Sequence, residues 1–279
     1  MLKRITSGLI FGAIVIITLV FLQNYICNIL ATLIAVASTY EFIKAINAYG
    51  YKPMRGVSYA SCAILLFIGA FPMREIYKWT LAFLGIMVIA CLIYAFFVRK
   101  GLTTLVDISF TFFVILYVDV LLSFFLLTYY IGYDGGNQLG KVWIWYVLFG
   151  ACMTDIFAYF IGSKFGKHKL CPEISPKKTV EGAIGGILGC MLAFIIYTFV
   201  LNKFFDFGIS YIKIALISII VAIFAQLGDL VASSIKRNAK IKDFGDVMPG
   251  HGGFLDRIDS ILFVSPIMYY FLVYFPHVF

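Results

Sequence analysis

The sequence predicts an all-α fold, a polytopic membrane helix bundle of about nine transmembrane helices with a cytoplasmic N-terminus. Composition, the spacing of apolar runs and the distribution of basic residues support this fold class. Of the 279 residues, 62% are hydrophobic and only 13% are charged, and the mean hydropathy is +0.99. Soluble domains usually carry about a quarter charged residues. A chain this apolar cannot cover a water-facing surface, which excludes a large soluble domain.

Apolar runs of about the length that crosses a bilayer, roughly 20 residues, recur along the whole chain. We expect spans at 6–22, 25–46, 57–71, 77–98, 106–131, 142–162, 180–201, 211–235 and 260–276. The third run is short and the fifth is long. The first follows a basic start but lacks a small-residue cleavage site, so we interpret it as a retained helix and not as a signal peptide.

The basic residues predict the orientation of these spans. With the N-terminus in the cytoplasm, the cytoplasmic loops carry 17 of the 22 Lys and Arg residues, and the opposite loops carry five. Cytoplasmic loops are enriched in Lys and Arg, so we expect a multi-pass protein of the cell membrane (inner or plasma membrane) whose active site faces the cytoplasm. These loops and anionic lipid explain the net charge of +8, and no nucleic-acid partner is expected.

Two cytoplasmic loops, 163–179 and 236–259, are too polar to be simple connectors. We therefore divide the chain into N-terminal transmembrane helices at 1–140, with about five spans, and a C-terminal transmembrane catalytic region at 141–279. Most acidic residues of the second region gather at the cytoplasmic ends of its spans. Outside it, Glu41, Asp107 and Asp119 are isolated acids that we interpret as structural or as snorkelling near the ends of spans.

The eighth predicted span carries a polar stripe. Its members are Gln226, Asp229, Ser233 and Lys236, whose spacing of 3, 4 and 3 residues places them on one helical face. An ionisable group inside a span is costly, which makes it a functional candidate. The plain alternative is an internal salt bridge, or a lysine that covers a structural aspartate.

The following segment adds carboxylates to this stripe. Asp256 and Asp259 lie three residues apart on the opening turn of the ninth predicted span. With Asp229 and Asp243 they offer the hard oxygen ligands that Mg²⁺ prefers when substrate phosphates complete its shell. Lys and Arg residues between them suit the same phosphates.

Two loop features suit anions as well. The glycines beside His251 let a backbone approach a phosphate closely, although packing remains the plain alternative for the histidine. In the sequence SPKKTVEG at 175–182, Lys177 and Lys178 precede Thr179, which can cap a helix whose free N–H groups face the cytoplasm. The alternative is a plain basic loop with an N-cap. Glu181 is either a ligand or a partner of Lys178, and the Gly-x-x-x-Gly pairs that follow predict close helix packing.

Residues 233–259 resemble the phosphatidate cytidylyltransferase family, also called CDP-diacylglycerol synthases. The family pattern is S-x-x-K-R-x4-K-D, a short spacer that ends in P, and then x-H-G-G-x-x-D-R-x-D. The chain has the matching residues Ser233, Lys236, Arg237, Lys242, Asp243, Pro249, His251, Gly252, Gly253, Asp256, Arg257 and Asp259. The resemblance covers about 150–265, including Thr154, Asp155, Ala158, Tyr159, Gly162 and the stretches 164–170 and 175–182. Lys164 stands where an arginine is common in the family.

The resemblance implies transfer of a cytidylyl group from CTP to phosphatidic acid, with release of pyrophosphate, for phospholipid synthesis. It implies Mg²⁺ as cofactor, with Asp229 and Asp256 as leading ligands and Asp243 and Asp259 as further ones; a second, monovalent cation is left open. The implied catalytic residues are Asp229, Asp256, Asp243, Lys236 and Arg237. The implied substrate-binding residues are Lys177, Lys178, Thr179, Glu181, Lys242, His251, Gly252, Gly253, Arg257 and Asp155. The expected partners are CTP, phosphatidic acid and the lipid bilayer, with a homodimer left open.

Two other functions compete with this one. A CTP-dependent lipid kinase of the polyprenol type has a neutral hydroxyl nucleophile that requires a base, and Asp243 is the candidate. A transporter would use Asp155 and Asp229 along a polar path, but it predicts paired repeats, which the sequence lacks. The phosphate of phosphatidic acid needs no base, because a phosphate monoester with a second pKa near 6 is already anionic.

Overall fold

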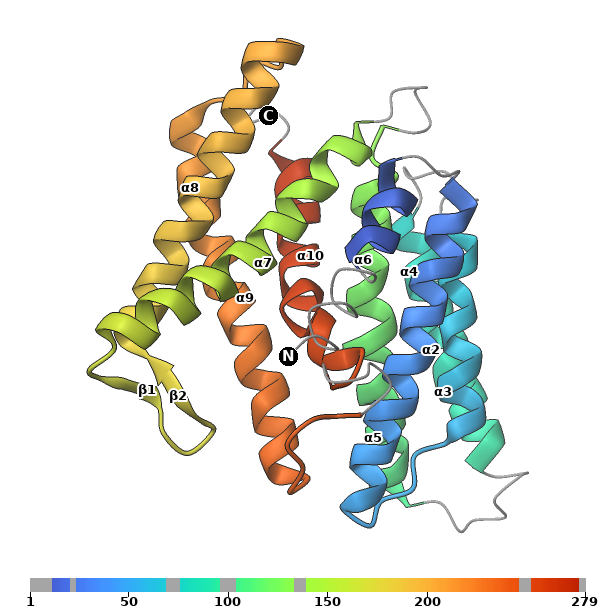
Figure 1. Cartoon of the computed structure of the whole chain (residues 1–279). Helices are drawn as coiled ribbons and strands as arrows, with labels where there is room; N and C mark the ends of the chain where they lie inside the picture. Colours follow the sequence, from blue (N-terminus) through green and yellow to red (C-terminus); the bar gives the residue numbers. More distant parts are fainter. Residues whose placement is uncertain are drawn as a thin grey trace. The chain divides into compact units, whose positions relative to one another are not determined.

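The computed structural model describes residues 12–20, 24–68, 76–95, 104–132, 139–245 and 252–275. Helices dominate this part of the chain (Figure 1). The helices are α2 (Asn24–Ala48), α3 (Arg55–Cys62), the short helix η1 (Ala63–Phe67), α4 (Ile76–Ile93), α5 (Leu105–Val114), the π-helical turn η4 (Ile115–Val120), α6 (Leu121–Tyr129), α7 (Gly140–Phe165), α8 (Val180–Phe205), α9 (Tyr211–Asn238) and α10 (Leu255–Tyr274). The predicted helical class is confirmed.

Six helical stretches of the described chain are long and apolar enough to cross a membrane. They are Tyr25–Ala48, Leu105–Tyr129, Gly140–Phe165, Val180–Phe205, Tyr211–Asn238 and Leu255–Tyr274. Each coincides with a predicted span, which supports a multi-pass membrane protein. The span predicted at 57–71 corresponds to the shorter apolar helix Arg55–Phe67, and the one at 77–98 overlaps α4. The run at 6–22 lies partly outside the described residues, so the count of nine and the orientation stay predictions.

The loop predicted at 163–179 contains a small β-hairpin, a local departure from the all-helical expectation. Strands β1 (Lys169–Cys171) and β2 (Ser175–Thr179) pair antiparallel, with Lys169 opposite Thr179 and Cys171 opposite Ser175. The N–H of Val180 donates a 2.9 Å hydrogen bond to the carbonyl oxygen of His168, which closes the hairpin at the start of α8. Part of the loop is therefore a regular element that leads directly into α8.

The chain packs as two units. The first comprises 1–141 and 238–257, and the second comprises 142–237 and 258–279. The segment 238–257 therefore packs with the N-terminal helices, whereas the sequence-based division at residue 140 separates the two. An aromatic cluster explains this packing: the buried Phe42 of α2 stacks on Tyr117 with 5.3 Å between ring centroids, and its centroid lies 5.8 Å from that of Phe244.

In the second unit, glycines let α8 approach α7 closely. A Cβ atom at Gly182 would lie 2.8 Å from the carbonyl oxygen of Ala158, and one at Gly186 would lie 2.9 Å from that of Thr154. A larger residue at either position would push the helices apart, so the close packing predicted for the Gly-x-x-x-Gly pairs is confirmed. Gly228 does the same for α9 and α10, since its Cβ would lie 2.6 Å from the carbonyl oxygen of Asp259.

Candidate functional site

An ion pair between β2 and α9 forms the centre of a polar cluster in the second unit. Nζ of Lys178 lies 2.6 Å from Oδ2 of Asp229, and Oγ of Ser233 donates a 3.4 Å hydrogen bond to Oδ1 of the same carboxylate. Three residues before Asp229, the side chain of Gln226 donates to the carbonyl oxygen of Ala183 over 3.2 Å. These residues use one face of α9, as predicted. The salt bridge of the alternative interpretation also forms, and Lys178 is its cation.

Two further carboxylates belong to this cluster. Asp259 of α10 is buried, at 6% exposure, and its Oδ1 accepts a 2.7 Å hydrogen bond from the N–H of Ser260. The hydroxyl of Ser260 donates over 3.2 Å to Oδ2 of Asp155 on α7. The negative charges of Asp229 and Asp155 both act on Asp259. Three helices and one strand of the second unit therefore bring charge to one place.

The side chains of this cluster include candidate ligands for a cation. Asp155, Asp229 and Asp259 bring carboxyl groups, and Lys178 and Lys236 bring ammonium groups. Carboxylate oxygens are also the ligands that Mg²⁺ prefers. In the described part of the chain, no three His, Cys, Asp or Glu side chains stand ready as a complete ligand set. A magnesium ion bound here would therefore need water or phosphate oxygens for its remaining ligands.

The β-hairpin separates the two predicted phosphate-binding lysines. Side chains of successive strand residues point to opposite sides, so the partly buried Lys178 faces Asp229 while Lys177 is exposed. Thr179 is buried and caps α8, since its Oγ1 accepts a 3.1 Å hydrogen bond from the N–H of Gly182. The predicted N-cap is confirmed, and the two lysines have different environments.

Glu181 has partners that the sequence did not predict. Its carboxylate accepts hydrogen bonds from the N–H groups of Lys167 and His168, at 3.0 and 3.2 Å, and lies 2.7 Å from Nδ1 of His168. The predicted alternative of a bridge to Lys178 is wrong, because that lysine pairs with Asp229. Glu181 holds the backbone that enters the hairpin, and its role toward substrate stays a prediction.

Arg237, at the end of α9, reaches the turn of the hairpin. Its Nε donates a 3.1 Å hydrogen bond to the carbonyl oxygen of Ile174, and its side chain is exposed. Lys236, the preceding residue, is partly buried, and its positive charge acts on Asp259. The two basic residues at the end of α9 therefore have different partners. Arg237 holds the hairpin turn, and Lys236 lies close enough for its charge to act on the buried Asp259.

The remaining predicted site residues belong to the first unit, around Asp256. Oδ2 of Asp256 accepts hydrogen bonds from the N–H groups of Phe244 and Gly253, at 2.9 and 3.1 Å. Gly252 has φ +84°, which favours glycine, and a Cβ there would lie 3.3 Å from Oδ2 of Asp256 and 3.5 Å from Cβ of Asp243. Two predicted metal ligands thus flank one glycine. Lys242 and Arg257 are exposed, and His251 lies outside the described residues.

A residue that sequence reasoning set aside also belongs to this part of the site. Glu41 of α2 is fully buried, and its carboxylate accepts hydrogen bonds from the N–H groups of Phe254 and Leu255, at 3.0 and 2.9 Å. Glu41 is therefore not isolated, and its hydrogen bonds are consistent with the structural role expected for it. The signal in the sequence was its position within an apolar span, where a carboxylate requires partners, but the sequence did not identify them.

The protein family model described as "Cytidylyltransferase family" matches residues 2–275 of the chain. The chain belongs to this cytidylyltransferase family. It is 34% identical to the phosphatidate cytidylyltransferase of Bacillus subtilis over 277 residues, which cover 99% of this chain and 98% of the relative. Identity is 40% to the phosphatidate cytidylyltransferase of Thermotoga maritima over 56% of this chain and 55% of the relative. It is 45% to that of Staphylococcus haemolyticus, over 48% and 50%.

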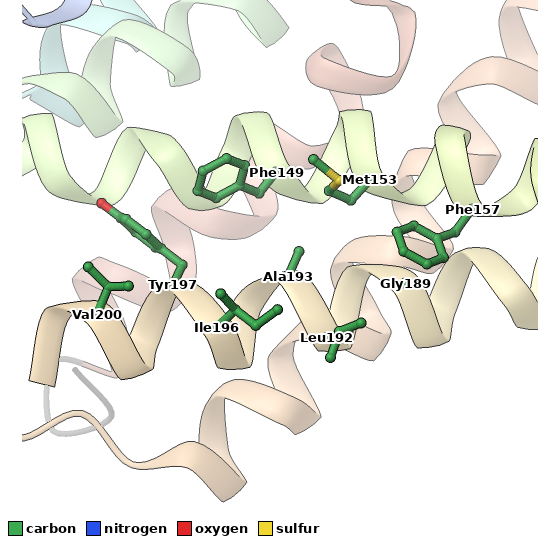
Figure 2. Close-up of a pocket in the computed structure, with 9 residues that line it drawn as sticks. All are labelled: Phe149, Met153, Phe157, Gly189, Leu192, Ala193, Ile196, Tyr197 and Val200. Carbon is green, nitrogen blue, oxygen red and sulfur yellow. The ribbon is translucent and has the colours of Figure 1, made fainter. Parts of the chain in front are cut away.

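The second unit also has an apolar groove (Figure 2). The groove has a volume of about 390 Å³ and runs along α7 and α8. It is lined by Phe149, Met153, Phe157, Gly189, Leu192, Ala193, Ile196, Tyr197 and Val200. Nucleotide phosphates would find no charged partner among these side chains. The groove is suited to hydrocarbon.

Proposed function

We propose that this protein transfers the cytidylyl group of CTP to phosphatidic acid, forming CDP-diacylglycerol and pyrophosphate at the cytoplasmic face of the cell membrane. The observation that carries the proposal is membership of the cytidylyltransferase family along nearly the whole chain. The acids and lysines described above support it, because a reaction between two polyanions needs cations close to carboxylates that can hold a metal. We expect nine spans, with both polar loops on the cytoplasmic side, and a homodimer is compatible with the proposal.

The reaction requires little acid–base chemistry from the protein. An anionic oxygen of phosphatidic acid bonds to the α-phosphorus of CTP, and the bond from that phosphorus to the bridging oxygen breaks as pyrophosphate leaves. The nucleophile is already deprotonated near neutral pH, because its second pKa is near 6. The protein must instead bring two anions together in line and stabilise the charge on the leaving group.

The carboxylates and the basic residues have separate tasks in this proposal. Asp229 and Asp256 would hold Mg²⁺ as leading ligands, and Asp243 and Asp259 would ligate it or orient the ligands. A metal ion held by these residues would supply electrostatic stabilisation for the charge that develops on the pyrophosphate. Binding of CTP offers the Lys178 ammonium group a second set of anionic partners besides Asp229. Lys236, Arg237, Lys242 and Arg257 bind phosphate oxygens of the two substrates, and Lys177 adds to the field that attracts CTP.

The lipid substrate keeps its tails in the bilayer while its phosphate reaches the polar cluster. The apolar groove along α7 and α8 suits this arrangement, since Asp155 and Thr179 belong to the polar part of the same two-helix layer. Acyl tails that stay in hydrocarbon expose no apolar surface to water, so the reaction carries no cost for moving them. The enzyme therefore needs to move only the head group.

Product analysis tests the proposal. Detergent-purified protein is incubated with CTP and Mg²⁺, with and without phosphatidic acid, and both pyrophosphate and CDP are measured. We expect pyrophosphate release that depends on phosphatidic acid, without CDP. CDP formation when a lipid alcohol replaces phosphatidic acid would instead identify a lipid kinase. Substrate flux into liposomes without nucleotide turnover would identify a transporter.

A further inference from the structure

Glu41 makes long-range contacts that are unusual for an acid within an apolar helix. Its two carboxylate oxygens accept the N–H groups of Phe254 and Leu255, which lie 213 and 214 residues further along the chain. These N–H groups belong to the opening of α10, where backbone donors have no partner within the helix. A negative charge at a helix N-terminus is stabilising. Glu41 therefore fixes the point at which α10 begins.

The glycines around Glu41 show how closely the backbone surrounds its carboxylate. A Cβ atom at Gly245 would lie 2.6 Å from Oε1 of Glu41, and one at Gly253 would clash with Oε2. Both glycines are buried. The neighbouring Phe42 packs against Phe244, so two successive residues of α2 hold the same loop. Any shift of Glu41 must move the backbone on both sides of it.

Asp256 binds the same backbone as Glu41. Its Oδ2 accepts the N–H groups of Phe244 and Gly253, while Glu41 accepts those of Phe254 and Leu255. The four donors come from the two short segments that Glu41 touches. The charge of Asp256 also acts directly on Glu41. The two carboxylates therefore form one arrangement, in which Glu41 anchors the backbone that aims Asp256.

We propose that Glu41 is a positioning residue for the reaction: its buried carboxylate fixes the backbone of residues 253–255 and thereby the direction in which Asp256 presents its carboxylate. This inference rests on the proposed function, because that function gives Asp256 its role as a metal ligand. It also gives the N-terminal helices a task in catalysis. Removal of a residue that orients a metal ligand typically lowers metal affinity or activity by about 10-fold to 100-fold.

The test compares Glu41→Gln with the matched control Asp107→Asn. Both substitutions keep size and remove one buried negative charge. Asp107 performs a similar task elsewhere in the first unit, since it accepts the N–H groups of Lys52 and Thr104 at 2.6 and 3.1 Å and lies at the start of α5. Glutamine can accept one of the two N–H groups with its oxygen but opposes the other with an amide donor. Of the two variants, only Glu41→Gln therefore disturbs the start of α10.

Two readouts are measured on each full-length variant. Hydrogen exchange should accelerate at least about 10-fold in peptides covering 252–258 for Glu41→Gln, because hydrogen bonds to a charged acceptor are lost. Asp107→Asn should leave these peptides unchanged. In turnover, Glu41→Gln should lower kcat about 10-fold to 100-fold and raise the Mg²⁺ concentration for half-maximal activity, per amount of folded protein. Asp107→Asn should keep both within about 3-fold, since the larger losses are typical of groups that orient a metal ligand and the Asp107 carboxylate holds the backbone of Lys52 and Thr104.

Each other outcome overturns a specific statement. Unchanged exchange at 252–258 in Glu41→Gln would remove the anchoring role. Faster exchange with native kcat and native Mg²⁺ dependence would show that the anchor is structural only, and would overturn the inference while leaving the proposed function intact. If Asp256→Ala itself retained native turnover, the proposed site would be wrong, and the positioning role would fall with it.

Discussion

Lys178 and Asp229 form an ion pair of 2.6 Å between a two-stranded hairpin and a membrane-spanning helix, and both side chains are less than one-third exposed, at 24% and 30%. The pair joins a loop residue to a carboxylate that lies more than two helical turns from the end of α9 at Asn238. Together with the hydrogen bond from Arg237 to Ile174, it holds the hairpin over the polar cluster. Its neighbour Lys177, on the opposite side of the strand, takes no part in it.

The first prediction compares these adjacent lysines. Lys178→Met leaves Asp229 without its cation, so we expect a loss of about 1–3 kcal/mol in the free energy of unfolding and a fall of at least about 10-fold in kcat/KM for CTP, or roughly 1.4 kcal/mol. Lys177→Met removes an exposed charge and should change stability by less than about 0.5 kcal/mol. Thermal unfolding and CTP kinetics of the two variants measure this difference. Equal effects of the two substitutions would contradict the assignment of Lys178, and not Lys177, to the polar cluster.

The second prediction concerns the leading metal ligands. Asp229→Ala and Asp256→Ala should each lower kcat by more than about 100-fold, because even the groups that merely orient a metal ligand contribute 10-fold to 100-fold. The protein should still fold, as judged by a native elution volume in detergent. Asp107→Asn provides the comparison, as a buried acid outside the site that should remain active. Similar activity in all three variants would reject the assignment.

The third prediction concerns Gly253. In Gly253→Ala the new methyl group meets the carboxylate of Glu41, and overpacking of this kind typically costs about 1–3 kcal/mol in stability. We expect lower turnover as well, because the displaced backbone carries Asp256. Gly85→Ala is the control: a Cβ at Gly85 of α4 meets no atom within 4 Å. Native stability and turnover in Gly253→Ala would contradict the tight arrangement around Glu41.

The fourth prediction concerns Arg237, whose Nε already holds the carbonyl oxygen of Ile174. Arg237→Lys keeps the charge but cannot hold this carbonyl and grip a phosphate at once. The loss of a charge-assisted hydrogen bond, about 1.5–3 kcal/mol, corresponds to roughly 10-fold to 150-fold in kcat/KM. Kinetics beside Lys240→Arg, a nearby exposed position outside the motif, isolate this effect. Near-native values for both variants would reject a phosphate-binding role for Arg237.

Local patterns were sufficient to predict much of this architecture. Apolar runs identified the membrane helices, the 3, 4, 3 spacing identified the polar face of α9, and the glycines of α8 identified a close helix crossing. The N-cap at Thr179 was readable because capping depends on residues three apart. These features succeed because each is determined by neighbours within one or two turns.

Features that depend on distant contacts were not readable from the sequence. The sequence around Glu41 does not predict a hydrogen bond to a residue 214 positions away, so the sequence alone indicates an isolated carboxylate. The hairpin at 169–179 was also missed, because its strands are short and mostly polar and lack the alternation that marks longer strands. The partner of Asp229 depends on that hairpin, which is why Lys178 and Lys177 looked equivalent before the fold was known.

The most direct test of the central claim follows the phosphorus atoms of CTP. Purified protein is given phosphatidic acid, Mg²⁺ and CTP labelled either at the α-phosphorus or at the γ-phosphorus, and the lipid product is extracted and counted. Cytidylyl transfer predicts that the α-label enters the lipid and the γ-label leaves in pyrophosphate. Entry of the γ-label into lipid, with the α-label left in CDP, would contradict the account.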